Sequence, residues 1–182
     1  ELRDRMRLWR ACRPDFGDDA SAVFNLLTGY SQGHDWQKLV VAPYHLVDRV
    51  LEMIDRERQH AEAGRPARII AKMNSLVDPR AIAALYTASQ AGVRIDLIIR
   101  GICCLRPGVA GVSENIRVVS IIDKFLEHSR IAYFQNGDKP EVYLSSADWM
   151  PRNFNRRVEL MFPVEDPRLH FRIVHELLGV YL

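Results

Sequence analysis

The sequence has few cysteines and no long apolar run, and these absences exclude several classes of protein. Its three cysteines are an odd set in which Cys103 and Cys104 are neighbours, so they do not form the spaced pairs that bind zinc or carry out dithiol redox chemistry. No apolar run approaches the roughly 20 residues that a membrane-spanning helix needs. The first residues are charged where a signal peptide would be apolar. We therefore expect reduced thiols, no membrane span and a cytoplasmic location.

An excess of charge of one sign is also missing. Lys and Arg number 25 and Asp and Glu 23, and the resulting net charge of +2 is too small to favour nucleic acid as a partner. Any anion site must therefore be local. The 182 residues, 48% of them hydrophobic, suffice for one α/β core. The sequence begins without Met on a charged stretch, and we expect it to be a fragment of a longer protein.

Strand-like and helix-like segments alternate in the first two thirds of the chain. Short β-branched runs predict strands over residues 37–42, 67–73 and 94–100. Between the first two runs, apolar residues recur at intervals of three and four, which predicts a helix. Asp78 followed by Pro79 predicts the start of a second helix. A strand, helix and strand of these lengths indicate a parallel βαβ unit.

The two ends of the chain are less regular. Residues 1–13 have helix-forming composition, Pro14 and Gly17 interrupt them, and an apolar stripe resumes over residues 20–27. After residue 100 we expect a loop and, around residues 118–122, at most a short helix. Asn136-Gly137 predicts a turn between two strand-like runs. A last strand is expected over residues 156–164, and then a helix that begins at Asp166-Pro167 with Leu169, Ile173, Leu177 and Leu178 facing inward. The fold class is α/β, a mixed sheet flanked by helices.

Polar residues follow two of the predicted strands at their carboxyl ends, where open α/β sheets bind ligands. Arg100 ends one apolar strand directly before Gly101, a residue that lets the backbone turn sharply or approach a ligand closely. Lys72 and Asn74 end another strand. Arginine binds phosphate through two parallel N–H bonds and lysine offers a point charge. These residues together predict a site for a polyanion.

A second group of candidates lies further along the chain. Ser145 and Ser146 offer hydroxyl donors near a strand end, Asp148 could take a metal or orient a histidine, and Arg152 adds positive charge. His128 could donate a proton to a leaving oxygen or, if protonated, neutralise charge. No histidines lie at a spacing that suits a shared metal, so no metal site is predicted in this chain.

Ordinary structural roles stay open for the same residues. Arg100 could pair with Asp96 or Glu114 rather than with phosphate. Asn74 could cap a turn, and Trp149 could pack in the core rather than stack on an adenine.

Three blocks of sequence resemble a known family in order and spacing. They are KMNSLVDPRAIAALYTASQAGVRIDLIIRGICCLRPG, SENIRVVSIIDKFLEHSRIAYFQNG and VYLSSADWMPRNFNRRVELMFPVEDPRL. Over residues 69–182 they resemble the C-terminal domain of the larger type of bacterial polyphosphate kinase. Upstream, VFNLLTGYSQ and KLVVAPYHL resemble the tail of the preceding domain and its connection. The implied organisation is a tail and linker region over residues 1–36 and a phospholipase-D-like catalytic domain over residues 37–182.

The resemblance implies two successive phospholipase-D-like domains that move the terminal phosphate of ATP onto polyphosphate, reversibly and with magnesium. It implies that Arg100 contacts the phosphates of the nucleotide and that His128 faces the phosphate being transferred. The histidine that becomes phosphorylated belongs to a His-x-Lys motif of the preceding domain, and no His-x-Lys occurs in this sequence. His128 with Arg130 resembles a degenerate copy of that motif. The run Ser145-Ser146-Ala147-Asp148 stands where related folds place a small-polar-asparagine run, and these departures shift the half-site toward binding or proton transfer.

The expected function is therefore half of a polyphosphate kinase site, inactive in isolation. The expected partners are ATP or ADP and polyphosphate, with Mg²⁺ ligands outside this chain, no nucleic acid, and a homo-oligomer in the full-length enzyme. A module that binds polyphosphate or nucleotide, or serves assembly, without turnover is the alternative. A phospholipase-D-like phosphodiesterase is less favoured, because it needs an intact His-x-Lys motif on each half.

Overall fold

The chain consists of two compact units in a computed structural model that describes residues 13–29, 35–121 and 127–182. The first unit is Glu1–Val40 and the second is Val41–Leu182. The helix expected over residues 1–13 lies outside the described residues except for its last position. The domain boundary expected after residue 36 stays a prediction.

In the first unit, helix α2 (Pro14–Leu27) begins at Pro14 after a non-helical Arg13, as the expected break at Pro14 requires, but it runs on through Gly17, so the interruption expected at Gly17 is wrong. Proline is accommodated because it occupies the first turn, where its missing N–H costs no hydrogen bond. Glycine inside a helix costs about 1 kcal/mol relative to alanine, which weakens the helix without ending it. The expected apolar stripe is only partly buried, since Val23 is buried and Leu27 is exposed.

The carboxylate of Asp19, on α2, explains why the first strand is short. It is fully buried and accepts hydrogen bonds from the backbone N–H groups of Gln37, Lys38 and Leu39 at 2.7–3.1 Å. These N–H groups are therefore not available for a strand ladder. The strand expected over residues 37–42 is accordingly reduced to β1 (Val40–Ala42).

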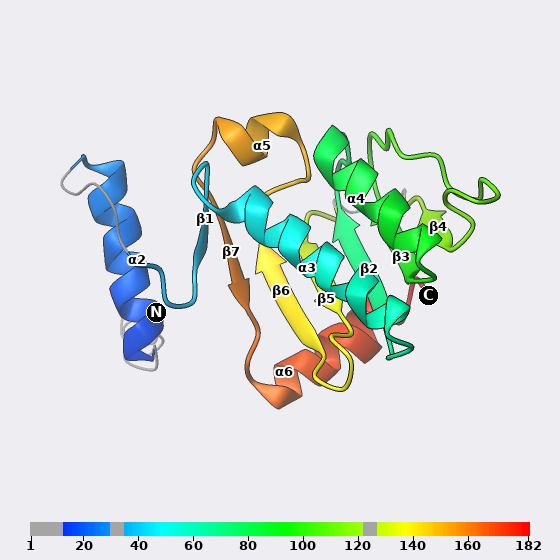
Figure 1. The fold of residues 1–182 in the computed structure, drawn as a ribbon. Helices are drawn as coiled ribbons and strands as arrows, with labels where there is room; N and C mark the ends of the chain where they lie inside the picture. The colour runs from blue at the N-terminus through cyan, green and yellow to red at the C-terminus, as the bar shows by residue number, and fades with distance from the viewer. Residues whose placement is uncertain (1–12, 30–34, 122–126) are drawn as a thin grey trace. The chain divides into compact units, whose positions relative to one another are not determined.

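A seven-stranded mixed sheet forms the second unit, with the order β1-β7-β6-β5-β2-β3-β4 (Figure 1). The other strands are β2 (Arg68–Met73), β3 (Arg94–Ile99), β4 (Ile116–Val119), β5 (Arg130–Phe134), β6 (Glu141–Ser145) and β7 (Glu159–Pro163). Strand β3 pairs parallel with β2 and β4, whereas β5, β6 and β7 continue the sheet from β2 in antiparallel pairs. The mixed sheet predicted from the sequence is confirmed.

One strand was not expected. Residues 116–119 form β4, which pairs in parallel register with residues 95–98 of β3, so the expectation of at most a short helix there is wrong. Three of its four residues are β-branched, which suits a strand. Ile122, the last residue of that expected segment, lies outside the described residues.

Two helices cover one face of the sheet, α3 (Leu46–Glu62) and α4 (Pro79–Gln90) (Figure 1). Asp78 caps α4 as predicted, because its side chain accepts from the backbone N–H groups of Arg80 at 3.0 Å and Ala81 at 3.3 Å. The short helix α5 (Pro151–Asn155) lies between β6 and β7 in the chain.

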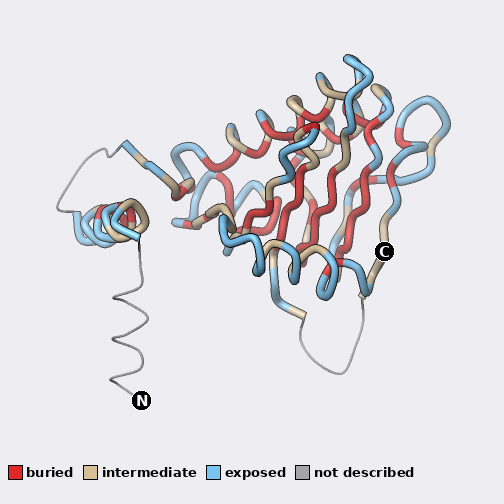
Figure 2. Tube along the Cα trace, turned by 90° about the horizontal axis from the view of Figure 1, so that it is seen from below, coloured by how far each residue is buried: buried red, intermediate tan, exposed pale blue. Residues whose placement is uncertain are grey.

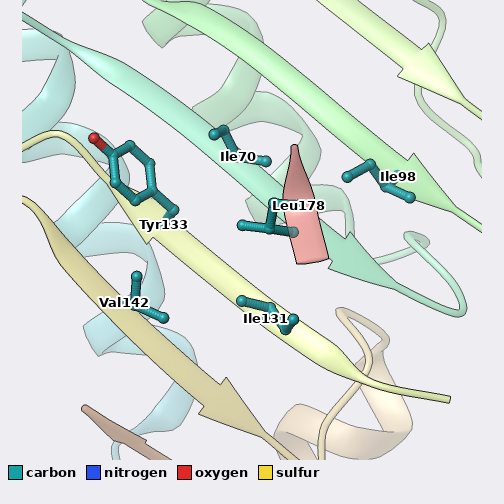
Figure 3. Close-up of a cluster of buried hydrophobic side chains, with 6 residues drawn as sticks. All are labelled: Ile70, Ile98, Ile131, Tyr133, Val142 and Leu178. Carbon is teal, nitrogen blue, oxygen red and sulfur yellow. The ribbon is translucent and has the colours of Figure 1, made fainter. Parts of the chain in front are cut away.

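The chain's last helix packs on the opposite face. Helix α6 (Pro167–Arg172) continues as a π-helix, η1 (Ile173–Leu178), and Leu178 sits among Ile70, Ile98 and Ile131 of the sheet (Figure 3). Asp166 caps this helix as predicted, accepting from the backbone N–H groups of residues 168 and 169. The cluster is completed by Tyr133 and Val142.

The inward stripe predicted for this helix is only partly correct. Leu178 is fully buried and Ile173 is half-buried, but Leu169 and Leu177 are exposed. The prediction assumed 3.6 residues per turn, and the wider π-helical turn, which begins at Ile173, changes which of the residues after it face the sheet. It does not account for Leu169, which precedes it in α6.

The central strands are buried along most of their length (Figure 2). Each fully buried aliphatic side chain contributes about 1.5–3 kcal/mol relative to an exposed one. The sheet is thus a rigid base for the loops at its edges. None of the helices in the described ranges has both the length and the apolarity that crossing a membrane requires.

Candidate functional site

The predicted site residues gather at one edge of the sheet. Strands β2, β3 and β6 end there, and β5 begins there, since Lys72 of β2 is in register with Ile131 of β5. The arrowheads of β2 and β6 point to this edge (Figure 1). We call it the site edge. It is the carboxyl-end position at which open α/β sheets bind ligands.

Arg100 follows β3 at the site edge. Its backbone N–H donates to the carbonyl of Met73 at 3.3 Å, and its side-chain Nε is buried without a hydrogen-bond partner. Within the described residues Arg100 forms no ion pair. Neither Asp96 nor Glu114, its alternative partners, contacts it there. A buried guanidinium donor without a partner costs free energy that an anionic ligand would recover.

Gly101 lets the two strand ends approach each other. Its N–H donates to the Asn74 carbonyl at 2.7 Å, and a Cβ at this position would lie 3.0 Å from the same oxygen. Only glycine fits this approach without a shift of the neighbouring backbone. Gly101 was expected to allow a sharp turn or a close approach to a ligand. In the structure the close approach is to the Asn74 carbonyl, and it joins the end of β3 to the end of β2.

His128, Arg130 and Asp148 form a connected chain of side chains. Nε and Nη2 of Arg130 donate to the two carboxylate oxygens of Asp148 at 3.1 and 3.2 Å. Nη1 of Arg130 lies 3.0 Å from Nδ1 of His128 and also donates to the His128 carbonyl at 3.1 Å. Asp148 thus contacts His128 only through Arg130. The imidazole itself is on an exposed residue at the site edge.

Asp148 is an ionised anchor for this chain. Burial opposes its ionisation most strongly, but the Arg130 guanidinium and the N–H groups of Asn74 outweigh burial and hold the pKa of Asp148 below its ordinary value. The Asn74 backbone N–H and Nδ2 both donate to Oδ1 of Asp148, at 2.8 and 3.1 Å. The side-chain amide of Asn74 is therefore oriented by Asp148, with its Oδ1 buried and without a partner.

Lys72 is buried, and its ammonium group already has partners within the chain. Its Nζ lies 3.0 Å from the carboxylate of Glu127 and donates to Oγ of Ser129 at 2.7 Å. A phosphate at Lys72 would have to compete with Glu127. Lys72 is therefore a weaker candidate for direct phosphate contact than Arg100.

The serines of the predicted site are engaged in local structure. Oγ of Ser145 donates to the Leu160 carbonyl at 2.9 Å and accepts from the Ala147 N–H at 3.0 Å. Oγ of Ser146 donates to the buried carboxylate of Glu159, which Nδ2 of Asn153 also contacts at 2.6 Å. These bonds join β6, α5 and β7 and fix the loop that carries Asp148.

The structure thus brings Arg100, His128 and Asn74 to one edge and places Arg152 on an exposed position of α5. The role of each in binding stays a prediction. Trp149 is 5% exposed and packs in the core, as its structural alternative predicted. Two partners were missed from the sequence, the Glu127 carboxylate on Lys72 and the Arg130 link to Asp148. For Arg130, the available signal in the sequence was its position two residues after His128.

The fold defines the class of protein. A phospholipase D family member, Nuc from Salmonella typhimurium, superposes with a TM-score of 0.53 over 78% of this chain and 91% of that chain at 17% identity. At this identity the likeness concerns the fold alone. The chain is an α/β domain with a phospholipase-D-like fold.

The family follows from closer matches. Residues 39–182 match the family model described as polyphosphate kinase C-terminal domain 2, so the chain belongs to that family. It is 58% identical over 171 residues to a polyphosphate kinase of Synechocystis sp., covering 94% of this chain and 23% of that protein. The polyphosphate kinase structure from Porphyromonas gingivalis superposes with a TM-score of 0.86 at 44% identity, over 89% of this chain and 25% of that one. The chain therefore spans about a quarter of the length of these relatives.

Proposed function

We propose that this chain supplies the nucleotide- and phosphate-binding half of a polyphosphate kinase site. The enzyme would transfer the terminal phosphate of ATP to polyphosphate, and the reverse, through a phosphohistidine on the preceding domain. The observation that carries the proposal is Arg100, an arginine at the site edge whose buried Nε has no partner. The family match and the lack of a His-x-Lys motif in this sequence support the division into half-sites.

The charges of the site edge suit phosphoryl transfer, which depends mainly on positioning and charge neutralisation. Lys72 and Arg130 are each paired with a carboxylate, at 3.0 and 3.1 Å, so their charge is largely balanced. Arg100 is a cation at this edge for which the described residues provide no ion pair. We infer that it binds the phosphates of ATP or ADP, and that exposed His128 lies beside the group that moves.

Magnesium would arrive with the nucleotide. The carboxylates nearest to the site edge, Glu127 and Asp148, are engaged by Lys72 and Arg130. The described residues hold no group of three His, Cys, Asp or Glu side chains that could bind a metal ion. The described residues therefore offer no set of ligands for a resident magnesium ion, and we propose that its protein ligands belong to other parts of the enzyme. Such an enzyme would work in the cytoplasm, where ATP is present and thiols such as Cys103 and Cys104 stay reduced.

Isothermal titration of the chain with ATP and with polyphosphate tests the binding half of the proposal. We expect both ligands to bind, and we expect Arg100→Ala to weaken ATP binding by at least about tenfold. Arg117→Ala is the matched control, because Arg117 is an exposed arginine on the neighbouring strand β4. Undetectable binding, or binding that Arg100→Ala leaves unchanged, would refute the assignment of this half-site.

Polyphosphate synthesis tests the catalytic half. The chain alone should be inactive with ATP, whereas the chain joined to the upstream region of its relatives should make polyphosphate. Synthesis by the chain alone would show that the attacking histidine is not in the preceding domain. A joined protein that binds both ligands without turnover would favour the binding or assembly module instead.

A further inference from the structure

We propose that Lys72 is a positioning residue, which fixes the segment that carries His128 and does not itself bind phosphate. Its effect on activity rests on the proposed function, because that effect requires His128 to lie beside the phosphate that moves. Its effect on the structure of the segment does not. Lys72 acts through Glu127 and Ser129, the two neighbours of His128 in the sequence.

Strand pairing does not fix the position of His128. Residues 127–129 precede β5 and belong to no helix or strand. The pairing of β5 with β6 begins at Arg130, and its pairing with β2 begins at Ile131, opposite Lys72. Arg130, two residues further along, donates to the His128 carbonyl at 3.1 Å. Side-chain contacts therefore decide where this segment lies.

Lys72 supplies such contacts from a different strand. Its Nζ lies 3.0 Å from the Glu127 carboxylate and donates to Oγ of Ser129 at 2.7 Å. Strand β2 pairs with β3 on one side and with β5 on the other, so the backbone that carries Lys72 is fixed on both sides. One ammonium group on a central strand thus contacts the residues immediately before and after His128.

The surroundings of the Lys72 ammonium group use most of its capacity for contacts. An ammonium group has three N–H donors and no acceptor. Two donors are directed to Glu127 and Ser129, and the centroid of the Tyr181 ring lies 5.8 Å from Nζ, within the range of a cation–π contact. The Lys72 side chain is only 3% exposed. A phosphate would have to displace Glu127 or Ser129 to reach Nζ.

Glu127 distinguishes a positioning lysine from a lysine that binds phosphate. If Lys72 binds phosphate, Glu127 competes with the ligand, and Glu127→Gln should strengthen ATP binding. If Lys72 only positions the segment, its ammonium group stays buried beside Ser129, and Glu127→Gln should leave ATP binding nearly unchanged.

Two lysine variants complete the comparison. Lys72→Met removes the ammonium group, keeps an unbranched side chain for the buried position, and leaves Glu127 with a side chain that is 37% exposed to water. The fold should therefore tolerate it. Lys139→Met is the matched control, because Lys139 is an exposed lysine in the turn between β5 and β6, at the opposite end of β5.

Titration calorimetry of the chain with ATP tests whether Lys72 binds phosphate. We expect Lys72→Met, Glu127→Gln and Lys139→Met each to bind ATP within about threefold of the unaltered chain, because exposed charges are screened by salt. Weakening of about tenfold or more by Lys72→Met, or strengthening of that size by Glu127→Gln, would make Lys72 a phosphate ligand and overturn the proposal.

Nuclear spin relaxation tests the structural effect on the chain itself, without a ligand. We expect backbone order parameters of about 0.85 for residues 127–129 in the unaltered chain and in Lys139→Met. In Lys72→Met they should fall below about 0.6, because the segment loses its contacts with β2. Order parameters that stay near the rigid value in Lys72→Met would refute the positioning role.

The activity test uses the chain joined to the upstream region of its relatives. We expect Lys72→Met to lower kcat about tenfold to a hundredfold while KM for ATP changes by less than about threefold, because displacement of a reacting group affects rate more than binding. Lys139→Met should leave both constants within about twofold. A rise in KM alone, or no change in either constant, overturns the proposal for Lys72. A joined protein that is inactive before any substitution, with the expected order parameters, counts against the proposed function alone.

Discussion

Two buried aspartates lie at opposite ends of the central strands. Both form ion pairs with arginine, but the surroundings of the two pairs differ. Asp96, 2% exposed, is contacted by Arg68, Arg94 and Arg117 near the start of β2 and β3. Asp148, 6% exposed, is contacted by Arg130 at the site edge. We call the first group the Asp96 cluster. The two groups differ in what the arginine contacts besides the aspartate.

The arginines of the two groups differ in exposure. Those of the Asp96 cluster have side chains that are 31–64% exposed, and Arg117 also donates to the backbone carbonyl of Leu182 at 3.2 Å. These contacts join strands to each other and to the end of the chain. Arg130 is 14% exposed and ends on an exposed histidine. The first group joins neighbouring strands, and the second contacts the ring of an exposed histidine, His128.

The largest expected difference between the two groups is in stability. Asp148→Ala leaves Arg130 as a poorly solvated charge and removes the acceptor for two N–H donors of Asn74, so we expect a loss of about 3 kcal/mol in the free energy of unfolding. Asp96→Ala leaves arginines that reach water, so we expect a loss of about 1 kcal/mol. Urea unfolding of both variants measures the difference. Equal losses, or a larger loss for Asp96→Ala, would contradict the distinction.

Phosphate binding should separate the two groups almost as clearly. Arg100→Lys at the site edge keeps the charge but loses the two parallel N–H bonds, so we expect the Kd for ATP to rise about tenfold. Arg94→Lys alters an exposed member of the Asp96 cluster and should leave that Kd within about twofold. Titration calorimetry on the chain measures both. An equal rise in both variants would mean that ATP senses overall charge rather than the site edge.

The parts of the fold that sequence predicted are those with local signals. Asp78 with Pro79 marked the start of α4, and β-branched runs marked β2 and β3, because capping and strand propensity involve near neighbours. Strand β4 was missed because it is stabilised by pairing with β3 across the intervening loop. The length of β1 was misjudged because Asp19 acts on it from 18 to 20 residues away.

The same division applies to the site. Arg100 was predictable because a strand end and a glycine flank it in the sequence. The partners of Lys72 and Arg130 lie 55 and 18 residues away, so they depend on how β2, β5 and β6 align. Only the structure shows that Lys72 and Ser146 are already engaged and that Arg100 is not.

Glycines at the two ends of the sheet offer a smaller contrast. Gly101→Ala forces a Cβ to 3.0 Å from the Asn74 carbonyl, and Gly137→Ala places alanine at a φ of +64° in the β5–β6 turn. Each should lower the free energy of unfolding by about 1 kcal/mol. Only Gly101→Ala should also weaken ATP binding, because it displaces Arg100. Calorimetry that finds weaker ATP binding in Gly137→Ala as well would contradict this separation.

The smallest expected effect is in the pH dependence of stability. Its sign should differ between Asp148 at the site edge and Glu57 at the opposite end of β2. Glu57 is fully buried near the start of β2, where it accepts from the N–H groups of Arg68 and Asn136. Burial raises its pKa despite these hydrogen bonds, whereas Arg130 and Asn74 outweigh burial and lower the pKa of Asp148. Because the pKa of Asp148 is lower in the folded chain, this carboxyl group stabilises the fold at pH values above its unfolded pKa of about 3.9. The stabilisation is lost as pH falls through the folded pKa. Because the pKa of Glu57 is higher in the folded chain, its contribution to stability is fully present at pH values below its unfolded pKa of about 4.3. This contribution is lost as pH rises through the folded pKa.

Asp148→Asn and Glu57→Gln measure these two signs. The stability of the unaltered chain relative to Asp148→Asn should increase as pH rises from about 3 to 5, because only the aspartate can ionise and pair with Arg130. Relative to Glu57→Gln it should decrease as pH rises above about 4.3, because the unfolded chain ionises Glu57 more readily than the folded chain does. Urea unfolding at a series of pH values gives both differences. If the two stability differences change with pH in the same direction, the ion pair with Arg130 does not make Asp148 titrate differently from a carboxyl group that is only buried.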